Sequence, residues 1–236
     1  MAPAILPAGQ EPPGNHELLS EVLLSNAWIK ISYMITIIDY GLGNLGSVKN
    51  MLKKIGVESE ISKDLDTVKR AKKIILPGVG AFDPAMERLT NNALRDVLDE
   101  KALQEKIPIM GICLGMQLLT NGSEEGRLPG LGWIPARSYK FSAEAFPGLK
   151  IPHMGWNFVV KTNEHKLTDG FSDEFRFYFV HSYYVKVQEP QYSILSASYG
   201  VVFDAAIQNA NIMGAQFHAE KSHKYGMKLF QNFATI

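Results

Sequence analysis

Short β-branched runs alternate with amphipathic stretches through the first half of the chain, from residue 34 onward. Runs of this kind are typical of buried strands, and apolar positions at helical spacing are typical of helices that cover a sheet. The predicted strands are 35–38, 57–61, 73–76 and 106–110. The predicted helices are 45–55, 64–71 and 83–105, the last with a break near 91–92. This alternation predicts a parallel sheet with helices on both faces.

The second half has a different pattern, which begins after the glycine-rich stretch 122–132. Its segments are short, aromatic or β-branched, and separated by turns, which is typical of antiparallel strands that extend the same sheet or pack beside it. These segments are 133–141, 157–161, 174–187, 193–199, 201–208 and 211–217. An amphipathic helix follows at 224–234. We therefore expect one α/β domain over 34–236, an open three-layer sheet with a parallel core and an antiparallel extension.

Residues 1–33 do not share these patterns. Residues 1–14 are rich in Pro and Gly, a composition typical of disorder. The next segment has no basic stretch ahead of its apolar residues, and Glu17 and Glu21 interrupt it, so it does not read as a signal peptide. Because Met34 directly precedes the first predicted strand, we expect residues 1–33 to be an extension outside the fold, disordered or an artefact of the start site.

Composition narrows the function classes. The chain has 236 residues, with 24 acidic and 24 basic side chains. This balance argues against a nucleic-acid-binding surface. A single cysteine excludes an internal disulfide and suits a reducing compartment, so we expect a cytoplasmic protein. No apolar run is long enough to span a bilayer, and we expect no membrane partner.

The segment Gly111–Gln117 contains the only cysteine, between a predicted strand and a predicted helix. A Gly-x-Cys-x-Gly at that junction has the layout of a nucleophile elbow, in which small residues permit a sharp, strained turn. Cys113 would then lie at a helix N-terminus, where the dipole and free N–H groups favour a thiolate. The alternative is a buried structural cysteine, and the elbow alone does not separate the two.

A cysteine nucleophile requires a base, and the base requires an orienting group. Among the six histidines, His218 ends a predicted strand and stands two residues before Glu220. Side chains at i and i+2 of an extended segment point the same way, so the carboxylate can steady the imidazole. The alternative is a solvated strand end. The spacing to His223 suggests a metal, but it is not the helical zinc pattern and no third ligand is evident, so we expect no metal.

Acyl transfer also requires donors for an oxyanion. The elbow offers the backbone N–H of Leu114, directly after the cysteine. A second donor can come from Pro77–Gly80, at the C-terminal end of the neighbouring parallel strand. That is the sheet edge where open α/β folds build their sites, which places both donors near the thiol.

Gly41-x-Gly43-x-x-Gly46 formally matches a dinucleotide-binding fingerprint. Two residues separate the predicted strand from these glycines, and the acidic candidates downstream lie in a segment of uncertain register. A nucleotide site would also leave the elbow without a role. We therefore interpret the glycines as a turn and expect no cofactor.

The segments 111–119 and 216–222 resemble class I (triad) glutamine amidotransferases. Within that class the chain resembles the glutaminase subunits of imidazole glycerol phosphate synthases. The narrower likeness rests on residues 39–44, 76–81, 123–126, 152–157 and 178–183. Together these motifs cover the chain from about residue 34 to residue 236. The implied fold is flavodoxin-like with a nucleophile elbow.

The resemblance implies a role for each matching position. The nucleophile, the proton carrier and its orienting carboxylate would be Cys113, His218 and Glu220. The oxyanion donors would be Gly78, Val79 and Leu114. Contacts to the substrate would come from Gly80, Gln117, Glu125, His181, Ser182 and Tyr183. The subunit interface and ammonia path would include Asn44, Met154, Trp156 and Tyr178. For these last four, a plain core or turn role is the alternative.

The implied reaction is hydrolysis of glutamine through a glutamyl thioester, with ammonia passed to a (βα)8-barrel cyclase in a heterodimer. That partner would make imidazole glycerol phosphate and an aminoimidazole carboxamide ribotide in histidine biosynthesis. Two departures from the family pattern are present. Ala219 replaces the usual Pro, which removes a fixed φ but keeps both functional groups, so we expect a modest effect at most. Residues 221–230 resemble paralogues that serve sugar amidation in surface-polysaccharide synthesis, which leaves the acceptor open. The rival functions are a stand-alone cysteine hydrolase and a non-catalytic interaction subunit.

Overall fold

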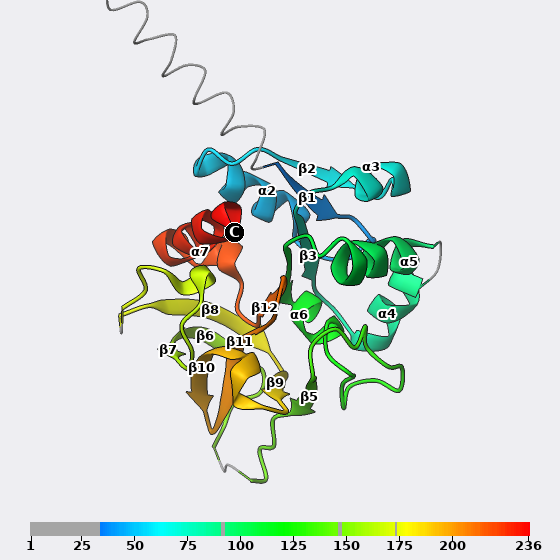
Figure 1. Ribbon diagram of the computed structural model, residues 1–236. Coiled ribbons are helices and arrows are strands. Elements are labelled where there is room, and N and C mark those ends of the chain that lie inside the picture. The colour runs from blue at the N-terminus through cyan, green and yellow to red at the C-terminus, as the bar shows by residue number, and fades with distance from the viewer. Residues whose placement is uncertain (1–33, 91–92, 146–147, 173) are drawn as a thin grey trace, which may run out of the picture.

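The computed structural model describes residues 34–90, 93–145, 148–172 and 174–236. The predictions for residues 1–33 and for a break at 91–92 lie outside these residues. The described chain forms an eight-stranded sheet in the order β2-β1-β3-β4-β12-β11-β10-β7 (Figure 1). Its strands are β1 (Ile35–Ile38), β2 (Ser59–Ser62), β3 (Ile74–Gly78), β4 (Ile109–Cys113), β7 (Val160–Lys161), β10 (Ser193–Tyr199), β11 (Val201–Asn209) and β12 (Ile212–Ala215).

The sheet is parallel from β2 to β12 and antiparallel from β12 to β7. This confirms the predicted parallel core with an antiparallel extension. One strand was assigned wrongly: the segment 211–217 was expected to be antiparallel, yet β12 runs parallel to β4 and antiparallel only to β11. Strand β12 therefore joins the two halves of the sheet.

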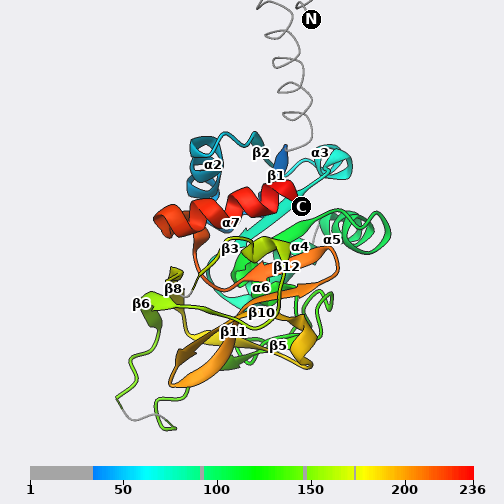
Figure 2. The ribbon, with the colours of Figure 1, turned by 60° about the vertical axis from the view of Figure 1, so that its left-hand side comes forward.

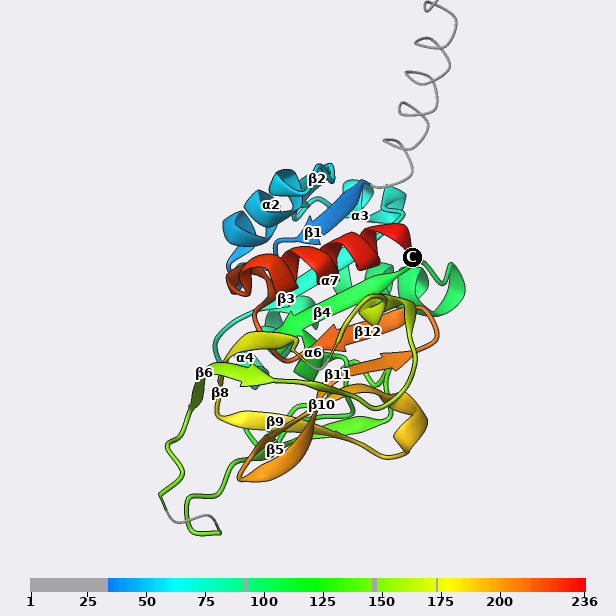
Figure 3. The ribbon, with the colours of Figure 1, turned by 90° about the vertical axis from the view of Figure 1, so that its left-hand side faces the viewer.

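Helices cover both faces of the parallel strands. They are α2 (Leu45–Lys54), α3 (Leu65–Arg70), α4 (Phe82–Thr90), α5 (Leu94–Asp99), α6 (Leu114–Leu118) and α7 (His223–Thr235). A π-helical turn, η1 (Glu100–Gln104), extends α5, and short 3-10 turns are η2 (Lys166–Thr168), η3 (Pro190–Tyr192) and η4 (Ala219–Lys221). Figure 3 shows α2 and α7 lying across the sheet on one face.

Alternate strand residues supply two separate cores, as the period of a strand requires. The core beneath α2 and α7 contains Ile35, Ile37, Ile75, Met110 and Ile112. The core beneath α3, α4, α5 and α6 contains Ile38, Ile74, Leu76 and Ile109. Each of these side chains is at most 2% exposed. The three layers predicted from the sequence are therefore present.

Two small antiparallel ladders pack beside the sheet. Strand β5 (Ala136–Lys140) pairs with β9 (Tyr183–Val187), and β6 (His153–Phe158) pairs with β8 (Arg176–His181). The predicted single strand 174–187 is thus two strands that change partners at Ser182. Figure 2 shows β6 and β8 together, close to the start of α7.

Local chemistry explains two further corrections. Pro77 and Gly78 end strand β3 instead of forming a loop with the next two residues. Asp83, the first residue of the predicted helix 83–105, lies inside the first turn of α4, which begins at Phe82. Its carboxylate accepts hydrogen bonds from the backbone N–H groups of Arg127 and Leu128, so it ties α4 to the 126–128 loop.

Candidate active site

Cys113 ends strand β4 and stands directly before helix α6, at the C-terminal edge of the parallel strands. Its φ of +55° and ψ of −113° are strained for a residue with a side chain. The tight turn depends on glycine at Gly78 and Gly115. A Cβ on Gly78 would overlap the backbone nitrogen of Gly115, and a Cβ on Gly115 would overlap the Leu76 carbonyl oxygen. The predicted elbow is therefore present.

The structure brings His218 and Glu220 together by a route other than the predicted one. Strand β12 ends at Ala215, and Glu220 lies in the 3-10 turn η4. His218 Nδ1 is nevertheless 2.8 Å from Glu220 Oε1, and both side chains are buried. The turn replaces the extended backbone that the spacing suggested, and the carboxylate still meets the ring.

The surroundings of His218 favour its charged form. Burial acts to lower the pKa of His218, but hydrogen bonds to Cys113 and Glu220, together with their negative charges, outweigh it and raise that pKa above its ordinary value. Both partners therefore stabilise the imidazolium form of His218. Glu220 Oε1 accepts from Nδ1, which leaves Nε2 to exchange a proton with the reacting groups.

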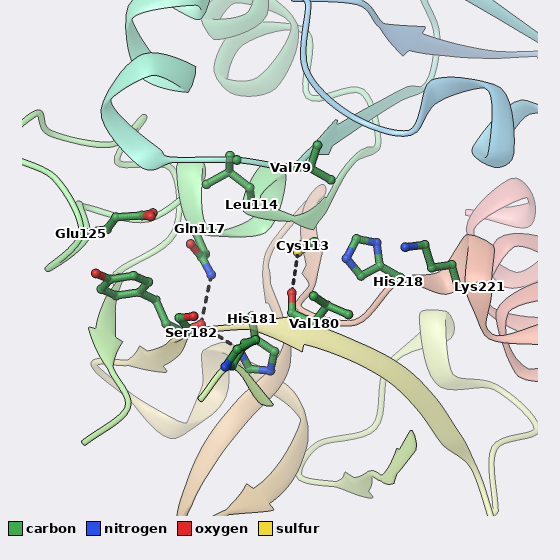
Figure 4. A pocket seen from close by; sticks show the side chains of 13 residues that line it. Val79, Cys113, Leu114, Gln117, Glu125, Val180, His181, Ser182, His218 and Lys221 are labelled. Atoms are coloured by element: carbon green, nitrogen blue, oxygen red, sulfur yellow. Dashed lines mark hydrogen bonds between the residues drawn. The ribbon is translucent and has the colours of Figure 1, made fainter. Parts of the chain in front are cut away.

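A pocket of about 330 Å³ opens over Cys113 (Figure 4). Ten of the predicted site residues line it: Val79, Gly80, Cys113, Leu114, Gln117, Glu125, His181, Ser182, Tyr183 and His218. Gly78 and Glu220 lie just behind this lining, next to Val79 and His218. Figure 4 shows Glu125 and Gln117 on one side of Cys113 in this pocket, and His218 and Lys221 on the other side.

Gln117 is held by its own amide nitrogen. Its Nε2 donates to the Tyr183 carbonyl at 3.1 Å and to Gln216 Oε1 at 3.1 Å. Because a carbonyl only accepts, this contact fixes which amide atom is the nitrogen. Both N–H bonds of Gln117 are then engaged within the protein. Its Oε1 is left as an acceptor suited to an ammonium group.

Glu125 is positioned by the N-terminus of α4. Its Oε2 accepts from the backbone N–H of Phe82, the first residue of that helix, at 3.1 Å. Burial is the main reason that the pKa of Glu125 is raised, while the hydrogen bond from Phe82 opposes the shift. The carboxylate therefore adds a second acceptor to the polar end of the pocket.

The proposed oxyanion donors lie on adjacent strands. Gly78 is opposite Cys113 in the parallel ladder between β3 and β4, so Val79 follows at the level of the elbow. Leu114 is the first residue of α6, and the backbone N–H of a first helical residue has no partner within its own helix. Both positions line the pocket next to the thiol.

The four predicted interface residues do not line the pocket. Met154 and Trp156 are 62% and 43% exposed on β6, and Tyr178 lies opposite Trp156 on β8. Asn44 is exposed just before α2, a helix that contacts η4. These residues therefore belong to a surface beside the pocket.

Sequence reasoning missed several residues at the site. Lys221, Pro152 and Val180 line the pocket, and Val180 O lies 3.8 Å from the Cys113 thiol. Ser222 ties the His218 backbone to β8, because its hydroxyl donates to His218 O and accepts from Tyr178 N. Of these residues, only Lys221 could have been suspected from the sequence, because its charged side chain directly follows Glu220. Among the described residues, no three His, Cys, Asp or Glu side chains cluster as a metal site requires.

Comparisons with known proteins agree with this geometry. The family model "Glutamine amidotransferase class-I" matches residues 36–236. The imidazole glycerol phosphate synthase subunit HisH 2 of Methanococcus maripaludis is 52% identical over 200 residues, 85% of this chain and 98% of that protein. HisH 2 of Pseudomonas aeruginosa is 49% identical over 203 residues, 86% of this chain and all of that protein.

Solved structures share the fold. A glutamine amidotransferase crystal structure has a TM-score of 0.66 at 14% identity and covers 86% of this chain and 99% of that chain. PurLQS from Thermotoga maritima has a TM-score of 0.63 at 20% identity, over 86% of this chain and 97% of that chain. With the family match and the HisH relatives, these findings lead to one conclusion: this chain belongs to the class-I glutamine amidotransferase family.

Proposed function

We propose that this chain is the glutaminase subunit of an imidazole glycerol phosphate synthase in histidine biosynthesis. The observation that carries the proposal is that Cys113 and His218 line one pocket and Glu220 binds His218 from behind, in a chain that is 49% identical to a HisH subunit over its whole length. The pocket has an acceptor-rich polar end that suits an α-amino group and a thiol at the other end. No helix among the described residues is long and apolar enough to cross a membrane.

The geometry supports a two-step hydrolysis. The Cys113 sulfur attacks the side-chain amide carbon of glutamine, and the oxyanion is met by the N–H groups of Leu114 and Val79. His218 gives its proton to the amide nitrogen, which leaves as ammonia, and a glutamyl thioester remains. Water then attacks the thioester, and His218 takes its proton. Glutamate leaves, and the Cys113 thiolate and His218 imidazolium, the pair that begins the reaction, are restored.

The ammonia would pass to a (βα)8-barrel cyclase that binds the surface around Met154 and Trp156. This surface is apolar and aromatic at its centre and basic at its margin. The Arg176 guanidinium lies 5.8 Å from the Trp156 ring centre, and Lys221 Nζ lies 6.0 Å from that of Tyr178. Such a surface fits a partner with an apolar centre and an acidic rim.

A second candidate acceptor is a sugar precursor of surface polysaccharide, served through a cyclase-like partner. The 221–230 segment is the observation that favours it. The acceptor binds the partner and not this chain, so both candidates share one glutaminase site. Identification of the chain that copurifies with this protein separates them.

Replacement of Cys113 by alanine tests the glutaminase proposal. We expect Cys113→Ala to abolish glutamate release from glutamine, because no other thiol is present to form the thioester. The measurement is glutamate production by the protein saturated with its copurifying partner. A glutamine-mimicking electrophile should add its mass to the peptide that contains Cys113.

Two outcomes would contradict the proposal. Glutamate release by Cys113→Ala at the wild-type rate would remove the thiol from the mechanism. Full activity without a partner, together with no preference for glutamine, would instead indicate a stand-alone cysteine hydrolase. His165→Asn is the control, because His165 caps the η2 turn outside the pocket.

A further inference from the structure

Two buried histidines lie side by side next to the polar end of the pocket. His153 on β6 is directly opposite His181 at the end of β8. Their side chains are joined by His153 Nδ1 and His181 Nε2, which are 2.9 Å apart. His181 lines the pocket, whereas His153 stands behind it. The catalytic steps above do not use either ring.

The Tyr183 carbonyl determines which nitrogen of each histidine ring carries the hydrogen. His181 Nδ1 lies 2.8 Å from Tyr183 O, and a carbonyl oxygen only accepts, so Nδ1 carries the hydrogen. In a neutral ring Nε2 is then bare and accepts. His153 Nδ1 must therefore be the donor to His181, and each ring is held in its Nδ1–H form.

The hydrogen bond between His153 and Asn157 has its direction fixed in the same way. His153 Nε2 is bare and lies 3.3 Å from Asn157 Nδ2. That amide nitrogen also donates to Ser198 O at 2.9 Å, which sets the orientation of the amide. Hydrogen bonds thus run from Asn157 through His153 and His181 to Tyr183. An added proton on either ring would place two N–H bonds face to face.

Aromatic rings surround the pair. The His153 ring is stacked on Phe179 and Tyr199, with centres 4.8 and 4.0 Å apart. This packing resists rotation of the ring and excludes water. Burial is the main cause that lowers the pKa of His153 to about 4 and that of His181 to about 3. Both rings are neutral at physiological pH, as the hydrogen-bond chain requires.

This row of hydrogen bonds ends at the backbone carbonyl of Tyr183, next to the pocket. Tyr183 O accepts from His181 and, at 3.1 Å, from Gln117 Nε2. These two donors engage both lone pairs of the carbonyl oxygen, so neither is left for a ligand. The same corner, Val180–Tyr183, passes from one ladder to the other at Ser182. Figure 4 shows His181 and Ser182 beneath Gln117.

We propose that His153 is a positioning residue for the glutamine subsite: through His181 it holds the Tyr183 carbonyl, and with it the backbone of the Val180–Tyr183 corner and the amide of Gln117. This inference rests on the proposed glutaminase function. It assigns to a residue that never touches the substrate a role in binding the amino-acid end of glutamine.

Two variants of His153 separate positioning from simple packing. Asparagine places an amide nitrogen near the position of Nδ1, and leucine fills the space without a donor. We expect His153→Leu to raise the KM for glutamine about tenfold and to leave kcat within about threefold, because the bond that it removes orders the subsite and not the nucleophile. His153→Asn should restore most of the wild-type KM.

Equal KM values for wild type and His153→Leu would overturn the proposal, as would equal losses in both variants. An independent readout uses the folded wild-type protein: 15N NMR of labelled histidines should show two rings in the neutral Nδ1–H form at pH 7. Assignment of His153 to the Nε2–H form or the charged form would also overturn it. A wild-type protein without glutaminase activity would refute the proposed function. The NMR result would still decide whether the hydrogen bonds from Asn157 through the two histidines to Tyr183 exist.

Discussion

Histidines whose pKa values are shifted in opposite directions lie within one site. His218 has a raised pKa because the Cys113 and Glu220 partners outweigh its burial, whereas burial dominates for His153 and His181. The charge on His218 also helps to keep His181 neutral. The pKa shifts differ because the hydrogen-bond partners differ. His218 has a carboxylate and a thiol as partners, whereas His153 and His181 have the Asn157 amide, the Tyr183 carbonyl and each other.

The buried neutral pair predicts an acid-side loss of stability. His153 has a lowered folded-state pKa of about 4, against an ordinary value of 6.5, so the unfolded chain binds the extra proton between these values. The free energy of unfolding should therefore fall as the pH falls from about 6.5 towards 4. The raised pKa of His218 has the opposite effect: the contribution of His218 to the free energy of unfolding is lost as the pH rises above its ordinary pKa.

The measurement is urea unfolding of wild type and His153→Asn at intervals from pH 7 to pH 4.5. Near pH 5 the variant should have a slope smaller by about 1.4 kcal/mol per pH unit, which corresponds to one proton. The carboxylates are the same in both proteins, so the difference between the two slopes of unfolding free energy against pH reports His153 alone. Parallel curves for the two proteins would show that His153 is not buried in its neutral form.

At the scale of residues, the sequence indicated a site wherever chemistry and spacing coincide. Cys113 between glycines, and His218 two residues before Glu220, were found in this way. Gln216 and Val180 approach the thiol through folding alone, and their residue types carry no such signal. The functional roles of all the site residues stay predictions until variants are measured.

Among the elements, α6 makes the closest approach to the sheet. It crosses β3 where Gly115 meets the Leu76 carbonyl, and Gly111 of β4 lies beneath the Gly115 backbone. Gly46, the last glycine of the formal dinucleotide fingerprint, has open space around its α-carbon. It therefore makes no close helix–strand contact of the kind that a dinucleotide fold requires.

These two glycines predict opposite effects of the same substitution. Gly115→Ala should destabilise the protein by about 3 kcal/mol, because the new methyl group overlaps backbone that cannot move away. Gly46→Ala should stabilise it by about 0.5–1 kcal/mol, since it lies in helix α2 and its methyl group meets nothing. Thermal and urea unfolding of both variants measure the difference. Similar stability of the two variants would contradict the close packing of α6 on β3.

Element types in the parallel half were predictable because apolar periodicity is a local property. Strand β1 was predicted with its observed bounds. The direction and partner of β12 were not predictable, since a short buried run pairs equally well on either side. The change of ladder at Ser182 was missed because aromatic and β-branched residues continue through it.

At the scale of the whole molecule, strand β6 presents exposed apolar side chains outside the pocket. Met154, Trp156 and Phe158 alternate along that strand and are 62%, 43% and 55% exposed. His223 at the start of α7 stacks on Trp156 with ring centres 5.6 Å apart. Large exposed apolar side chains of this kind are typical of a protein-binding surface.

Trp156→Ala should weaken binding of the copurifying partner about thirtyfold, in line with about 2 kcal/mol for an aromatic anchor. Thermal stability should change little, because the side chain is 43% exposed. Isothermal titration with the partner gives the affinity. Leu103→Ala is the matched control, since Leu103 is 52% exposed but lies in η1, away from β6. A larger loss for Leu103→Ala than for Trp156→Ala would place the partner elsewhere.

Strand β12 lies in the middle of the sheet although 103 residues separate Gln216, just after it, from Cys113. During synthesis on a ribosome, β4 therefore has an unpaired edge until β12 emerges and pairs with it. Unpaired strand edges can pair with other chains, so a chain that ends before β12 is more prone to aggregation than the complete fold. The base His218 emerges only after β12. A chain that stops before β12 therefore lacks two of the three side chains that we propose for glutamine hydrolysis.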